Sequence, residues 1–355
     1  MTRWDQAREL LRLGRRRPPN GVEDASGGER AAGEGEPGEG RMGAIRALGA
    51  RARRAVGAAT GAQAIATTDD DAGTIFDAGP RARSICIASG KGGTGKSSVS
   101  ASLATLFSRR GRTLLLDADL GCANAHILQD VHPEHSFADV IAGDRGVADI
   151  VTPCREGLDL LPGGSGFARL AGLRTYELEM IGRGLARLEP EYDYMVVDSA
   201  AGLSRQTVAF AAACDMTVLV TTPDVTAMTD AYAFLKVFVR QCGVQGIDRP
   251  MPLLVVNRVT DAIEGEQVAR RLQDVVMKFL GQRLEFLATL PDDRAAFRCI
   301  QRRTTVADGE PDSELGRALA ALSNGVLSRA ARIENRGAGR RLVDAAAAEK
   351  SVRRR

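Results

Sequence analysis

The amino-acid sequence predicts an α/β fold, with a mainly parallel, doubly wound sheet of about seven strands and helices on both of its faces. Short apolar runs alternate with longer amphipathic segments from residue 84 to residue 331, as in sheets that helices cover on both sides. A glycine-rich loop follows the first of these runs, and aspartates end two others. Ligands of such sheets bind outside the carboxyl ends of the strands, so we expect the functional site there.

The individual elements follow from apolar spacing. Strands are expected at residues 84–89, 112–117, 158–161, 193–198, 215–221, 252–257 and 285–290. The main helices are expected at residues 97–110, 174–188, 204–213, 225–241, 262–280 and 312–331. The last helix carries leucines at helical spacing, and we expect it to pack in the core rather than to anchor the chain in a membrane.

The glycine-rich loop fits the pattern G-x-x-x-x-G-K-[ST], in which backbone N–H groups surround the phosphates of a nucleotide. It consists of Gly90, Lys91, Gly92, Gly93, Thr94, Gly95, Lys96, Ser97 and Ser98. Lys96 is expected to reach the β- and γ-phosphates, and Ser97 to bind Mg²⁺. Lys91 is a second cation, placed to meet phosphate charge across a dimer interface. The alternative is a glycine-rich turn with an incidental lysine, which the strand before and the helix after make the weaker interpretation.

Carboxylates end two of the expected strands. Asp117 and Asp119 follow one apolar run and Asp198 ends another, and buried carboxylates need a compensating cation. We expect Asp117 and Asp198 to hold Mg²⁺ together with Ser97, partly through water. Asn257 ends a later strand, where its amide can pair with adenine, although asparagine there is also a common turn residue.

Composition narrows the class of protein. The net charge of +3 is too small to indicate nucleic-acid binding by itself. The sequence contains no run of 18 apolar residues, so no transmembrane helix is expected. The six cysteines are widely spaced without a C-x-x-C pair, which favours a reduced, cytosolic protein. The three histidines lack metal-ligand spacing, so no zinc site is expected.

Both ends of the chain differ from the central region. Residues 1–14 are expected to form a short amphipathic helix, and residues 15–80, rich in glycine, alanine, arginine and glutamate, a disordered linker. Residues 332–355 are expected to form a basic, disordered tail. This tail has few bulky apolar residues, so we expect weak or absent lipid binding through it.

The motifs resemble those of the deviant Walker A ATPases of the MinD/ParA class over residues 84–331. Within that class, three stretches are similar to the FlhG-type flagellar-number ATPases: residues 117–124 (D-A-D-L-G-C-A-N), 161–166 (L-P-G-G-S-G) and 221–232 (T-T-P-D-V-T through T-D-A-Y). At the N-terminus, Asp5, Gln6, Ala7 and Leu10 resemble the D-Q-A-x-x-L-R segment that stimulates the SRP-type GTPase FlhF, although Leu11 replaces its arginine.

The resemblance implies an ATP-binding and ATP-hydrolysing switch that forms a homodimer and regulates flagellar number or placement with FlhF and flagellar assembly components. Lys91 would contact ATP across the dimer, Lys96 would act within its own subunit, and Asp119 would position the attacking water. The implied location is cytoplasmic, with peripheral membrane association at the cell pole left open.

The sequence also departs from the family pattern within residues 84–331, where His126 stands at a position that is usually aspartate in relatives and Ala200 at one that is glycine in FlhG. Other functions stay open. One is a ParA-like partition ATPase that binds DNA nonspecifically, although no specific nucleic acid is expected. Another is a MinD-like division-site regulator, and a third is a scaffold that binds nucleotide without hydrolysing it.

Overall fold

The computed structural model of the protein describes residues 81–120, 123–164, 172–245 and 249–353. The predictions for residues 1–14 and 15–80 lie outside the described residues, and so does the expected partner-binding set of Asp5, Gln6, Ala7 and Leu10. Within the described part, no helix combines the length and the apolar character needed to cross a bilayer.

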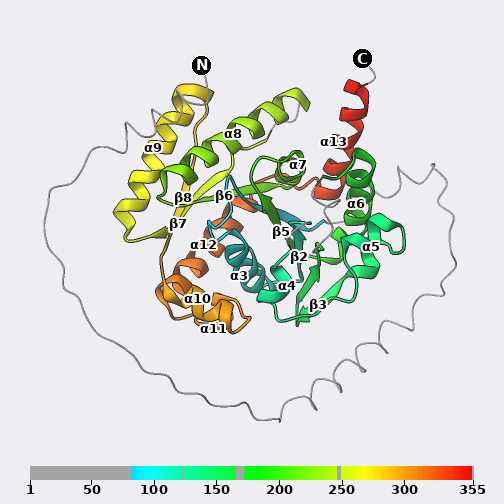
Figure 1. Cartoon of the computed structure of the whole chain (residues 1–355), viewed down its shortest axis with the longest axis horizontal. Helices are drawn as coiled ribbons and strands as arrows, with labels where there is room; N and C mark the ends of the chain where they lie inside the picture. The colour runs from blue at the N-terminus through cyan, green and yellow to red at the C-terminus, as the bar shows by residue number, and fades with distance from the viewer. Residues whose placement is uncertain (1–80, 121–122, 165–171, 246–248, 354–355) are drawn as a thin grey trace, which may run out of the picture. The chain divides into compact units, whose positions relative to one another are not determined.

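An eight-stranded sheet in the order β3-β4-β2-β5-β1-β6-β7-β8 forms the centre of the fold (Figure 1). Neighbouring strands run parallel except β3 and β4, which are antiparallel. The strands are β1 (Arg83–Ser89), β2 (Thr113–Ala118), β3 (Thr152–Arg155), β4 (Leu158–Leu161), β5 (Tyr194–Ala201), β6 (Met216–Thr221), β7 (Leu253–Val259) and β8 (Phe286–Pro291). The predicted α/β class and the mainly parallel, doubly wound sheet are confirmed.

Helices cover both faces of the sheet and bury two separate cores (Figure 1). One face carries α5 (Phe137–Ala142), α6 (Thr175–Leu188), α7 (Arg205–Ala213), α8 (Val225–Gln245), α9 (Ala262–Leu280) and α13 (Ala338–Arg353). The other carries α3 (Lys96–Ser108), α4 (Ala125–Leu128), α10 (Arg294–Gln301), α11 (Val306–Gly309) and α12 (Glu314–Ala330). The short helices η3 (Val147–Ile150) and η5 (Glu189–Glu191) complete the described elements.

Strand β1 contributes side chains to both cores. Cys86 and Ala88 point to one core, whereas Ile85 and Ile87 point to the other, as the two-residue period of a strand requires. All four side chains are fully buried, which explains why the strand is an unbroken apolar run. Helix α12 packs in the second core as expected, through residues such as Leu319 and Leu322.

Strand β3 was not expected, and it makes the sheet one strand wider than predicted. Its four residues include Pro153, which cannot donate a backbone hydrogen bond. Such a segment can form a strand only at the edge of a sheet, where one side needs no partner, and β3 lies at that edge.

The expectation of a disordered tail at residues 332–355 is wrong for most of its length, because Ala338–Arg353 forms helix α13, packed against α6 and α7. Two glycines allow the backbones of α13 and α6 to approach closely. A Cβ atom on Gly182 would lie 2.9 Å from the carbonyl oxygen of Gly339, and one on Gly339 would lie 2.4 Å from the backbone nitrogen of Ala186. Close packing of small residues thus compensates for the small number of bulky apolar groups in the segment, of which Leu342 is buried in the core.

A buried ion pair also fixes α13. Arg341 Nη1 lies 2.7 Å from Asp215 Oδ1 and donates to the carbonyl oxygen of Ala213 at 3.1 Å. The other oxygen of Asp215 accepts from the backbone N–H and the hydroxyl of Ser84, both at 2.9 Å. Asp215 therefore joins the start of β1 to the C-terminal helix, and both groups of the pair are almost entirely buried.

Candidate nucleotide site

The glycine-rich loop joins the end of β1 to the start of α3 at the carboxyl edge of the sheet. Gly93 and Gly95 have φ angles of 80° and 86°, which glycine adopts without strain. Gly95 caps α3 without a side-chain hydrogen bond, and the first turn of α3 has no acidic residue. The N–H groups of this turn are therefore available to a phosphate, and the helix dipole favours its negative charge.

Two neighbours hold the loop closely. A Cβ atom on Gly90 would lie 2.2 Å from the backbone carbonyl of Asp230 in α8, so only glycine fits there. On the other side, the Asn257 side chain donates a hydrogen bond of 2.8 Å from Nδ2 to the carbonyl oxygen of Thr94. Asn257 therefore supports the loop from the end of β7, and its contact with adenine stays a prediction.

Lys96 is buried beneath the loop and pairs with Asp198. The distance between Lys96 Nζ and Asp198 Oδ1 is 2.7 Å, and the hydroxyl of Ser100 donates to the same oxygen at 2.9 Å. Burial by itself lowers the pKa of Lys96, but the charge of Asp198 and its hydrogen bond outweigh it, so the pKa is raised. Lys96 is thus held charged where phosphates would bind.

Asp117 lies opposite Asp198 in the register of β2 and β5. Its carboxylate accepts backbone N–H groups from Asn124 and Ala125, both at 2.9 Å, and from Asp119 at 3.1 Å. Burial and the charge of Asp198 nevertheless raise the pKa of Asp117 to about 7. Two buried carboxylates thus share the single ammonium group of Lys96, which leaves the site short of positive charge.

A divalent cation could supply the positive charge that the two buried carboxylates lack. Among the described residues, no cluster of three or more His, Cys, Asp or Glu side chains could hold a metal ion by itself. Mg²⁺ typically uses one or two carboxylates, several waters and the phosphates of a substrate. Ser97 belongs to the loop and lines the space above it. Asp117 already accepts three hydrogen bonds and Asp198 two, so most of their acceptor positions are used. The residues fit an Mg²⁺ ion that arrives with a nucleotide and meets the carboxylates through water.

Lys91 lies on the outer side of the loop. Its Nζ donates a hydrogen bond of 2.7 Å to the hydroxyl of Thr226, in the first turn of α8. The neighbouring Gly92 and Gly93 are exposed. The two lysines of the loop are therefore placed differently, because Lys96 is buried against a carboxylate and Lys91 is held at the rim by a neutral group.

A hollow of about 410 Å³ lies over the loop. Of the predicted site residues, it is lined by Lys91, Gly92, Gly93, Thr94, Gly95, Lys96, Ser97, Ser98 and Asp119. Asp117 and Asp198 are buried outside this lining, and Asn257 lies behind the loop. The sequence pattern did not indicate the apolar wall of the hollow, which is formed by Ile127 and Leu128 of α4 and Ile300 of α10. The four-residue spacing of Ala296 and Ile300, which places both on one face of a helix, is the sequence feature that could have predicted α10.

Fold and loop together define a P-loop ATPase of the MinD/ParA class. A family model described as the CobQ/CobB/MinD/ParA nucleotide binding domain matches residues 85–306, and the chain belongs to this family. The antiactivator FleN of Pseudomonas aeruginosa is 30% identical over 243 residues, covering 68% of this chain and 85% of FleN. The flagellum site-determining protein YlxH of Helicobacter pylori is 31% identical over 235 residues, covering 65% of this chain and 76% of YlxH. These relatives confirm the FlhG-type resemblance.

Solved structures agree with this family. The septum site-determining protein MinD of Pyrococcus horikoshii, complexed with Mg-ADP, is 25% identical with a TM-score of 0.57, covering 69% of this chain and 96% of that one. The cell division ATPase MinD of Pyrococcus furiosus has a TM-score of 0.58 at 24% identity, covering 70% of this chain and 99% of that one. The first of these relatives shows that members of the family bind a magnesium nucleotide.

Proposed function

We propose that this protein is an ATP- and Mg²⁺-dependent dimerisation switch that regulates flagellar number or placement together with the SRP-type GTPase FlhF. ATP bound in the loop joins two subunits face to face, and hydrolysis to ADP and phosphate releases them. The placement of Lys91 carries this proposal. Its ammonium group lies at the rim of the site and contacts only a neutral hydroxyl among the interactions described for it, so a facing subunit's phosphates could compete for it.

The chain's own residues divide the work of phosphoryl transfer. Bound Mg²⁺ neutralises phosphate charge, and Ser97 would hold it directly, with Asp117 and Asp198 acting through water. Lys96 holds phosphates within its own subunit, and Lys91 those of the partner. Positioning and charge neutralisation dominate this reaction, so Asp119 needs only to orient the attacking water on the wall of the hollow.

The similarity to YlxH, whose name is flagellum site-determining protein, supports the flagellar role. The proposed partner contact uses Asp5, Gln6, Ala7 and Leu10, and flagellar assembly components are further partners of the dimer. The protein would act in the cytoplasm, and it would bind the membrane at the cell pole only weakly. Helix α13 supports weak membrane binding, because its apolar side chains Leu342 and Ala346 are only 1% and 3% exposed and are not available to lipid.

The flagellar role is tested by measuring GTP hydrolysis by FlhF with a peptide of residues 1–14. The peptide should accelerate hydrolysis, and the same peptide with Gln6→Ala should not, because Gln6 belongs to the proposed contact. Equal rates with both peptides, or no acceleration at all, would remove the flagellar role. The ATPase assignment would then remain with the ParA-like function as alternative, for which DNA binding must require ATP and weaken steeply with salt.

A further inference from the structure

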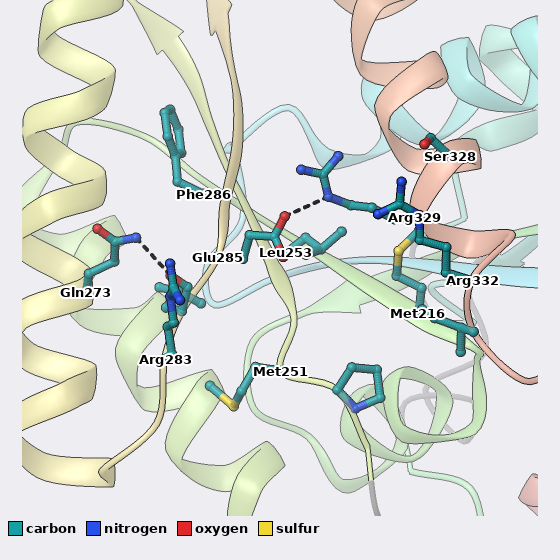
Figure 2. Close-up of a pocket in the computed structure, with 13 residues that line it drawn as sticks. Met216, Met251, Leu253, Gln273, Arg283, Glu285, Phe286, Ser328, Arg329 and Arg332 are labelled. Carbon is teal, nitrogen blue, oxygen red and sulfur yellow. Dashed lines mark hydrogen bonds and ion pairs between the residues drawn. The ribbon is translucent and has the colours of Figure 1, made fainter.

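A second hollow, of about 880 Å³, lies at the amino ends of β6, β7 and β8, on the edge of the sheet opposite the nucleotide site. Helix α9 borders it on one side and α12 on the other (Figure 2). Because this edge faces away from the glycine-rich loop, the hollow would stay accessible when two subunits meet over their nucleotides.

The floor of this hollow, which we name the amino-edge hollow, is apolar. Met216, Leu253 and Phe286 are the first residues of three neighbouring strands. Met216 and Leu253 are almost entirely buried, so the accessible apolar surface comes from the partly exposed Met251, Phe286 and Ile333. Methionine side chains are flexible and adapt to different apolar partners. The floor can therefore bury a bulky apolar group without requiring one fixed shape.

The rim of the amino-edge hollow is positively charged. Arg329 Nε lies 2.7 Å from Glu285 Oε1, so these two charges balance each other (Figure 2). Arg283 and Arg332 also line the hollow, and their side chains make no hydrogen bond or ion pair with the part of the chain that the structure describes. Figure 2 shows Arg283 on the side of α9 and Arg332 on the side of α12. Two uncompensated guanidinium groups thus flank an apolar floor.

We infer that the amino-edge hollow binds an acidic peptide segment of a partner protein, with carboxylates flanking a large apolar side chain. The guanidinium groups of Arg283 and Arg332 receive the carboxylates, because arginine matches their planar geometry with paired donors. The apolar side chain enters between Met251 and Phe286. Arginine and methionine are both enriched at protein interfaces, and the volume of the hollow is near the upper end of the range for ligand pockets.

The probe is a fluorescein-labelled synthetic peptide of about ten residues, in which aspartate or glutamate alternates with leucine or phenylalanine. Fluorescence anisotropy with the full-length protein should show saturable, micromolar binding that weakens as salt is added. A peptide with asparagine and glutamine in place of the acids should bind at least tenfold more weakly. Failure of the acidic peptide to bind, or equal binding of both peptides, overturns the inference.

Variants locate the binding. Arg283→Glu with Arg332→Glu should weaken the affinity at least tenfold, whereas the control pair Arg145→Glu with Arg187→Glu, exposed arginines outside the hollow, should leave it unchanged. Met251→Trp should also weaken binding, because it fills the hollow and leaves the charge intact. None of these residues belongs to the nucleotide site, so unchanged ATP hydrolysis reports correct folding. Equal loss in the control pair, or full binding by the Met251→Trp variant, contradicts the assigned location.

Discussion

An Asp119→Ala variant should bind Mg-ATP and form dimers, yet hydrolyse ATP at least about a hundredfold more slowly than the wild type. Asp119 lies on the wall of the nucleotide hollow, and its backbone N–H donates to Asp117 at 3.1 Å, which fixes its place beside the site. The proposed role of its carboxylate is to orient water toward the γ-phosphate, a contribution that matters for hydrolysis and not for binding. The variant should therefore accumulate as an ATP-bound dimer.

Phosphate release and molar mass, measured on the same sample, check this result. Asp144→Ala is a suitable control, because Asp144 is exposed and does not line the hollow. The control should hydrolyse ATP and return to monomers at the wild-type rate. Wild-type turnover by the Asp119→Ala variant would show that the water is oriented by another group.

Replacing Arg341 with alanine should lower the free energy of unfolding by about 3–5 kcal/mol, because it leaves the charge of Asp215 buried without its partner. Asp215 is 1% exposed, and its remaining hydrogen bonds come from Ser84. Urea unfolding followed by circular dichroism measures the loss. Helix α13 should also become more sensitive to proteolysis, since Arg341 holds it against the core.

Lys350→Ala provides the matched control on the same helix. Lys350 pairs with Glu179 at the surface, where such pairs contribute at most about 1 kcal/mol. The double variant Asp215→Asn with Arg341→Met should recover part of the stability that Arg341→Ala loses, because both charges of the pair are removed together. Equal, small losses for Arg341→Ala and Lys350→Ala would contradict the buried ion pair.

The sequence predicts most of the sheet because its parallel strands are buried on both faces. A run such as Leu114, Leu115 and Leu116, bounded by polar residues, is typical of such a strand, and the expected strand starts agree with the structure to within one residue. Strand β3 escapes this reasoning because it is short, contains Pro153 and lies at the edge.

Helix α13 could not be predicted because its stability is non-local. Gly339 packs against Gly182 and Arg341 pairs with Asp215, and both partners lie more than 100 residues earlier in the sequence. Its alanine-rich composition, with few bulky apolar residues, resembles that of a disordered tail. Neither helical spacing nor composition shows that two glycines will meet.

The candidate site also has features that the sequence predicts and features that it does not. The residues of the loop are contiguous and follow one pattern, so the sequence identifies them together. The contact of Lys91 with Thr226 and the pairing of Lys96 with Asp198 join segments 135 and 102 positions apart. The apolar wall at Ile300 belongs to α10, a short helix that the sequence analysis did not assign. Tertiary packing, rather than local pattern, sets these features.

The proposed dimerisation requires that a magnesium-bound triphosphate joins two subunits through Lys91. Its most direct test is the molar mass by light scattering, with and without Mg-ATP, using Asp119→Ala to prevent turnover. The mass should rise from the 37.7 kDa of one chain to about twice that value, and adding Lys91→Ala should abolish the rise without preventing nucleotide binding. A mass that does not respond to Mg-ATP would contradict nucleotide-dependent dimerisation, and a dimer that persists when Lys91 is replaced would contradict the proposed role of Lys91.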